Sequence, residues 1–141
     1  LSAEDGTLVP DAVAQVLNDV ADVWSWYDGS IITALPSSGR QPKHRDYSMP
    51  KTAAGVWKIV TFSPVLDVPA RGGLTVCVSQ THLGNDSGKT CQIRLKAGDV
   101  LVFFSSMLHY GAANSTPCER VLLSQTFEAS GKGLESLQFF D

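Results

Sequence analysis

Residues 98–127 constrain the fold of this chain more than any other stretch. A Gly-Asp turn leads into the apolar run 100–104, and a second run, 121–127, begins directly after Arg120. Short apolar runs bounded by turn residues are typical of buried β-strands. His109 and a polar loop lie between the two runs. The stretch therefore predicts two strands, with a histidine at the end of the first and an arginine at the start of the second.

A second histidine motif lies upstream, at His44-Arg45-Asp46. Residues two apart on an extended segment face the same side, so His44 and Asp46 can converge on one point, and His109 can supply a third ligand. Two imidazoles and one carboxylate form the facial triad that suits non-haem iron(II) and leaves coordination positions open. A lone HxD pattern is common in surface loops, and the same donors can also bind zinc.

Arg120 adds a cation next to this predicted metal site. Leu122, two positions further along the second run, is apolar, which predicts that this side of the strand faces inward. A buried arginine needs an anion, and its planar guanidinium can hold a carboxylate through two parallel hydrogen bonds. A dicarboxylic cosubstrate such as 2-oxoglutarate needs a metal at its keto-acid end and a cation at its far end. The alternative is an arginine that faces solvent.

These residues, together with GDVLVFF before His109, resemble the iron(II)/2-oxoglutarate dioxygenases. Within that superfamily the phytanoyl-CoA dioxygenase-like branch is the most similar, because residues 34–36 and the glycine-rich segment 72–82 resemble its leucine-proline and glycine-rich segments. Residues 80–82 are Gln-Thr-His where that branch usually has Gly-Ser-His. The resemblance covers roughly residues 31–127.

The resemblance implies that His44, Asp46 and His109 are the catalytic metal ligands for Fe(II). It also implies that Arg120 binds 2-oxoglutarate, that dioxygen is the second cosubstrate and that ascorbate serves as an accessory reductant. The implied reaction is the hydroxylation of a small or lipid-like organic substrate, with release of succinate and CO2. A prolyl-hydroxylase-type enzyme acting on a peptide, and a cupin-like metal-binding module without oxygenase activity, are the alternatives; a small-molecule substrate is favoured over a peptide.

Other polar and aromatic residues near the motifs have simpler explanations. His82 ends a predicted strand in a corner that is usually structural, so it is left out of the ligand set. Tyr47 and Trp57 follow the first motif, where core packing is the favoured role, and Lys43 is expected to be solvated.

The remaining sequence predicts a single domain over residues 1–141. Apolar residues at helical spacing after Pro10 predict a helix at about 10–24 that packs against the outside of a sheet. A turn is expected at residues 28–29. About seven short strands then predict an all-β core with a flanking helix, which the resemblance makes a double-stranded β-helix (jelly-roll, cupin-like barrel) over about 31–127. Residues 131–141 form a tail in which the phenylalanines at 139–140 are expected to dock.

Composition narrows the functional classes. A net charge of −3 without a Lys/Arg cluster argues against a nucleic-acid partner, and no apolar run approaches a membrane span. The three cysteines lack a metal-type spacing, and Cys77 and Cys91 lie in strand-like segments. Buried free thiols are therefore expected, which favours a reducing, cytoplasmic location. The first residue is leucine, so we also expect a trimmed chain or mature fragment, and whether a targeting segment was removed stays open.

Overall fold

The computed structural model describes residues 9–49, 51–52, 54–131 and 133–134, in which one helix and seven strands form two antiparallel sheets. The elements are α1 (Asp11–Val20), β1 (Val23–Ala34), β2 (Trp57–Pro64), β3 (Thr75–Val78), β4 (Thr90–Ile93), β5 (Leu101–Phe104), β6 (His109–Gly111) and β7 (Arg120–Ser130). The larger sheet has the order β1-β7-β2-β5 and the smaller sheet β4-β3-β6. The predicted all-β jelly-roll with a flanking helix is confirmed.

The main core lies between the two sheets. Strands of the larger sheet and segments on the side of the smaller sheet contribute alternate apolar side chains, as expected for two sheets packed face to face. The buried members of this inner cluster are Val60, Phe62, Val68, Leu74, Cys77, Leu95, Phe103, Met107 and Leu122.

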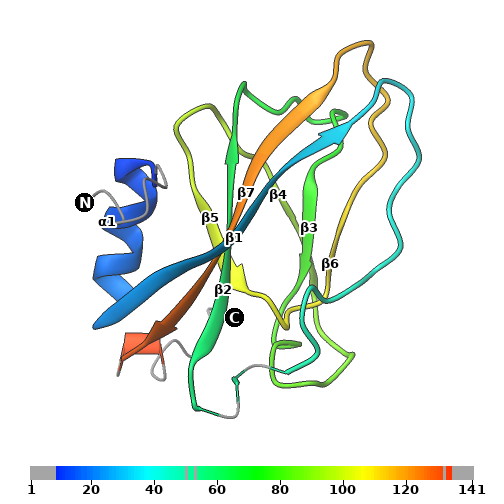
Figure 1. The fold of residues 1–141 in the computed structure, drawn as a ribbon. Helices are drawn as coiled ribbons and strands as arrows, with labels where there is room; N and C mark the ends of the chain where they lie inside the picture. The colour runs from blue at the N-terminus through cyan, green and yellow to red at the C-terminus, as the bar shows by residue number, and fades with distance from the viewer. Residues whose placement is uncertain (1–8, 50, 53, 132, 135–141) are drawn as a thin grey trace.

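A second apolar cluster lies on the other face of the larger sheet, beneath α1. Val13 and Leu17 of the helix are fully buried and pack with Ile59 and Phe127 of the sheet. Figure 1 shows α1 on one side of the larger sheet and β3 and β6 on the other. The predicted packing of the helix against the outside of a sheet is therefore confirmed.

The N-terminal boundaries differ from the prediction. The helix ends at Val20, and Trp24 lies in β1, which begins at Val23. Trp24 fits the helical spacing of the apolar residues before it and also the alternation of a strand. Its ring packs edge-on against Phe127, at 5.5 Å between centroids, on the helix-covered face of the sheet. The expected turn at residues 28–29 is instead part of β1, which pairs with β7 over its length and accommodates a register shift between Trp26 and Asp28. Residues 1–6 and the tail from 135 onward lie outside the described residues.

The three cysteines are free thiols. Cys77 is buried in β3, and desolvation raises its pKa to about 12. Its cross-strand neighbour Cys91 is exposed, contrary to the prediction, because β4 is an edge strand of the smaller sheet.

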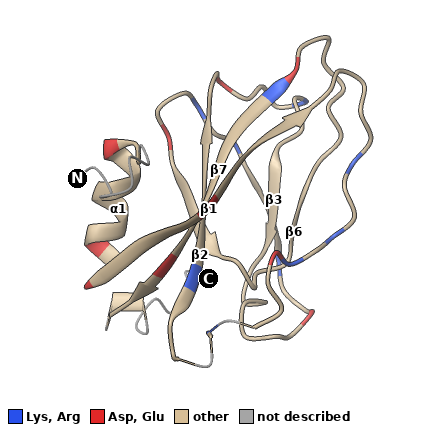
Figure 2. Cartoon of the chain, in the orientation of Figure 1, with Lys and Arg blue, Asp and Glu red and all other residues tan. Residues whose placement is uncertain are grey.

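Charge is dispersed over the molecule. In Figure 2, Lys and Arg are spread among Asp and Glu over strands and loops instead of gathering on one element. Among the described residues there is no helix with the length and apolar content needed to cross a membrane.

Candidate metal centre

The structure brings the three predicted ligands, His44, Asp46 and His109, together. Their ligand atoms all lie within 4.8 Å of one another, and Nε2 of each histidine is 3.7 Å from Asp46 Oδ1. In the described part of the chain this is the one group of at least three His, Cys, Asp or Glu residues with such spacing. His82 lies outside it.

Backbone pairing sets this geometry. The His44 and His109 backbones form an isolated antiparallel bridge, in which each N–H donates to the other residue's carbonyl at 3.0 Å. The Asp46 N–H donates to Ser105 O, also at 3.0 Å. The HxD segment is thus held against the chain just before and within β6, so the ligands from two distant parts of the sequence are placed as neighbours.

Hydrogen bonds also orient the two imidazoles. His44 Nδ1 lies 2.9 Å from Pro42 O, and His109 Nδ1 lies 3.0 Å from Met107 O. A carbonyl can only accept, so Nδ1 carries the proton in each ring and Nε2 keeps its lone pair on the side of Asp46. Burial is the main effect that lowers the pKa of His109, which favours the neutral ring that a metal ligand requires. The donor set therefore fits a divalent transition metal.

Arg120 lines the same cavity as the triad, whose volume is about 270 Å³. Its side chain is buried, with 7% of the residue exposed, and burial lowers the pKa of the guanidinium. Nη1 donates to Gly73 O at 2.7 Å, whereas Nε is buried with no partner, and no carboxylate of the described residues pairs with it. A buried cation without a counter-anion next to a metal-ligand set is the arrangement expected of an anion-binding site.

Gln41 brings a polar group close to this arginine and was not anticipated from the sequence. Its Oε1 accepts from the Gly111 N–H at 2.8 Å. A Cβ at position 111 would lie 2.9 Å from that oxygen, so the end of the Gln41 side chain would have to shift, and it would be in ordinary contact with Arg120 Nη1 at 3.6 Å.

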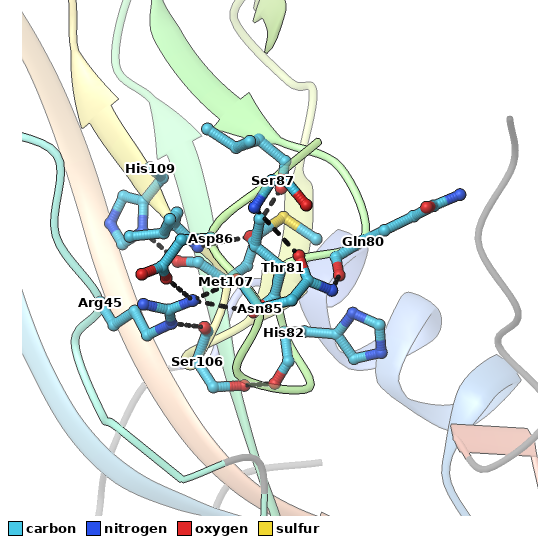
Figure 3. A network of polar contacts seen from close by, with 12 residues as sticks. Arg45, Gln80, Thr81, His82, Asn85, Asp86, Ser87, Ser106, Met107 and His109 are labelled. Carbon is cyan, nitrogen blue, oxygen red and sulfur yellow. Dashed lines mark hydrogen bonds and ion pairs between the residues drawn. The ribbon is translucent and has the colours of Figure 1, made fainter. Parts of the chain in front are cut away.

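Arg45 is a second contributor that the sequence did not reveal. It stands between His44 and Asp46 in the sequence, and Figure 3 shows its guanidinium directed at Asn85 and Asp86 of the loop after β3. Its Nε donates to Ser106 O at 2.8 Å, and its Nη2 donates to Asn85 O at 2.6 Å and to Asp86 Oδ1 at 2.9 Å. These bonds tie the HxD segment to the turn that precedes His109. The available signal was its position, since the residue between two same-face ligands must face the other way.

The structure also locates the four other residues considered from the sequence. His82 is buried, with its ring stacked on Phe104 at 5.3 Å between centroids. Trp57 is buried in the cluster beneath α1, as expected, and Lys43 is exposed. Tyr47 lines the cavity, where core packing had been expected.

Comparison with known proteins finds similarity at the level of the fold. No protein-family model and no curated protein sequence matches this chain. The solved structure of EvdMO1 superposes with a TM-score of 0.73 at 17% identity, covering 88% of this chain and 32% of that one. The non-heme alpha-ketoglutarate-dependent epimerase SnoN from nogalamycin biosynthesis gives 0.67 at 22% identity, covering 82% and 50%. The carbocyclase SnoK, from the same biosynthesis and also alpha-ketoglutarate-dependent, gives 0.64 at 16% identity, covering 74% and 50%.

The chain thus spans half or less of the length of these three structures. At such identities, the likeness establishes that this chain has the jelly-roll fold on which structurally similar non-haem, alpha-ketoglutarate-dependent enzymes are built.

Proposed function

We propose that this protein is a non-haem iron(II) and 2-oxoglutarate-dependent oxygenase. The observation that carries the proposal is the pairing, within one cavity, of a two-histidine, one-carboxylate cluster with the buried, unpaired Nε of Arg120. The first group suits the metal and the second suits the distal carboxylate of a dicarboxylic keto acid. The alpha-ketoglutarate dependence of structural neighbours supports the same proposal.

In this proposal the chain's own residues bind, orient and exclude water. His44, Asp46 and His109 would hold iron(II), and Arg120 would fix the far end of 2-oxoglutarate. The rings of Phe62 and Phe103 pack against His109 at 6.2 and 4.8 Å between centroids and exclude water from that side of the imidazole. Iron(II) with 2-oxoglutarate and dioxygen supplies the oxidation, with succinate and CO2 as products and ascorbate as an accessory reductant.

Hydroxylation of a small organic molecule is the outcome that we propose, within the phytanoyl-CoA dioxygenase-like branch. The neighbours include a carbocyclase, an epimerase and a monooxygenase, so one scaffold supports several outcomes. A prolyl-hydroxylase-type reaction on a peptide is the competing enzyme assignment. A cupin-like module that binds zinc or another metal at the triad, without oxygenase activity, is the competing assignment from a different class.

An anaerobic optical titration tests the proposal. Metal-free protein is mixed with iron(II), with 2-oxoglutarate, and with both; a visible charge-transfer band that needs both components is expected. The Arg120→Gln variant, loaded with iron, should need a higher 2-oxoglutarate concentration to develop the band. Iron-loaded wild-type protein that shows no band at any 2-oxoglutarate concentration would favour the binding-module assignment.

A further inference from the structure

The cavity has a polar wall where a jelly-roll interior is normally apolar. Two cross-strand pairs of β1 and β7 line the cavity beside the metal ligands: Ser30 opposite Ser124, and Asp28 opposite Thr126. Directly opposed side chains on antiparallel strands point to the same face, so these four residues form one continuous surface, which we call the polar wall.

The polar wall continues toward Arg120 through one apolar pair. Ile32 lies opposite Leu122, and both line the cavity, as Arg120 does two residues earlier on β7. The inward residues of β7 therefore run from a cation through an aliphatic side chain to two hydroxyls. The cation and the aliphatic pair suit 2-oxoglutarate, whose carboxylate is followed by methylene groups. The polar wall is not needed to bind 2-oxoglutarate and is therefore available to a second ligand.

The two faces of these strands depart from the usual pattern of a half-buried sheet. Ile31 lies between Ser30 and Ile32, faces away from the cavity and is 72% exposed; its partner across the strands is Leu123. A half-buried sheet normally places apolar side chains inward and polar ones outward. Solvent at the cavity mouth accounts for the exposed Asp28 and Ser30 of β1, whereas Ser124 and Thr126 of β7 are half-buried and line the cavity. The hydroxyls of these two residues can hydrogen-bond a ligand that enters the cavity.

We propose that the prime substrate is a hydroxyl-rich small molecule, a polyol or a sugar, which lies on the polar wall; this inference rests on the oxygenase function proposed above. Serine and threonine hydroxyls both donate and accept, and a carboxylate accepts, so the wall can satisfy several substrate hydroxyls at once. The N–H of Gly29 donates to Asp28 Oδ1 at 2.7 Å, which orients that carboxylate. A lipid chain would instead desolvate these groups without replacing their hydrogen bonds.

Ligand-observed saturation-transfer NMR on the metal-free protein tests this inference without relying on turnover. The probes are methyl α-glucoside, methyl α-galactoside and myo-inositol, with 1-octanol as the lipid-like comparison. We expect saturable binding of at least one polyol and weaker or no binding of octanol. The double variant Ser124→Ala/Thr126→Val should bind that polyol at least tenfold more weakly. Thr33→Val, on the outward face of β1, is the matched control and should bind like wild type.

Three results would overturn the inference: no saturable polyol binding, tighter binding of octanol than of every polyol, or equal polyol affinity in the double variant and wild type. The optical titration with iron(II) and 2-oxoglutarate separates this failure from failure of the proposed function. A normal charge-transfer band together with any of these three results would reject the substrate class alone. Polyol binding to the wall without a charge-transfer band would reject the oxygenase function and keep the wall as a polyol site.

Discussion

The two faces of β7 carry opposite properties. Toward α1, Phe127 and Ala129 are fully or almost fully buried in an apolar cluster closed by Leu17 of the helix. Toward the smaller sheet, the alternate residues of the same strand include Arg120 and Ser124, which line the cavity. One strand thus contributes only packing through one set of alternate residues, whereas the other set combines the core residue Leu122 with polar residues that line the cavity.

Stability and ligand binding are therefore expected to depend on different residues of β7. Removing an apolar side chain from the helix-covered face leaves a cavity, whereas Ser124 and Thr126 on the cavity face are only half-buried. Substitutions on the helix-covered face should therefore lower the free energy of unfolding. Substitutions of Ser124 and Thr126 should lower ligand affinity and leave stability nearly unchanged.

The largest contrast is expected between two buried histidines. His109→Ala should abolish stoichiometric iron binding, because it removes one of three ligands. His82→Ala should retain the metal but unfold more easily, since His82 stacks on Phe104 of the cluster beneath α1. Metal content after gel filtration, with thermal unfolding in parallel, measures both. Loss of iron in His82→Ala with retention in His109→Ala would show that the ligands are misassigned.

Truncation on the helix-covered face should give the largest change in stability. Phe127→Ala should lower the free energy of unfolding by about 3–5 kcal/mol, the usual cost of deleting a fully buried aromatic ring. The adjacent Thr126→Ala, on the cavity face, should change it by only about 0.5 kcal/mol. Urea denaturation of the metal-free proteins measures the two values. Similar losses for both would remove the distinction between the faces.

Arg120 gives the corresponding test on the cavity face. Arg120→Gln should weaken 2-oxoglutarate binding by about 2–5 kcal/mol, roughly 30- to 5,000-fold in affinity. Iron binding and chelation by pyruvate, which lacks the second carboxylate, should be unchanged. Arg120→Lys should fall between the two, because one ammonium replaces a planar fork. Calorimetry with manganese(II) in the absence of oxygen measures all three; equal affinities for 2-oxoglutarate would exclude Arg120 from the site.

The smallest effect is expected from Arg45, which touches no ligand atom in the triad. Arg45→Met should weaken metal binding by about 10- to 100-fold, the usual cost of losing a residue that holds metal ligands in position. Arg94→Met, at an exposed arginine, is the matched control. Metal affinity should fall by more than any change in the unfolding temperature of the metal-free protein would explain. If affinity is unchanged, the hydrogen bonds of Arg45 serve the loop after β3 alone.

Several features were readable from the sequence because they depend on local patterns. The apolar runs 100–104 and 121–127 predicted strands close to the observed bounds of β5 and β7, since alternation and flanking turns are local signals. The HxD spacing and the apolar run before His109 singled out the three residues that the structure brings within 4.8 Å of one another.

Other features depend on partners distant in the chain and were therefore missed. Trp24 fits a helical and a strand period equally, and only the pairing of β1 with β7 decides between them. The Gly29 turn signal fails for the same reason, because the bulge beside it is fixed by β7. Arg45 donates hydrogen bonds to Asn85 and Asp86, which lie 40 and 41 positions further along the chain. The polar wall forms only through the register between β1 and β7. No local sequence pattern predicts the hydrogen bonds of Arg45 or the polar wall.

A crystal structure of the protein with manganese(II) and 2-oxoglutarate, from crystals grown without oxygen, would test most directly whether the triad binds the metal and Arg120 binds the keto acid. We expect the metal on His44 Nε2, Asp46 Oδ1 and His109 Nε2, and the distal carboxylate of 2-oxoglutarate within hydrogen-bond distance of the Arg120 guanidinium. We also expect the polar wall to remain open to the metal. A metal bound elsewhere, or a keto acid whose far carboxylate avoids Arg120, would contradict the account.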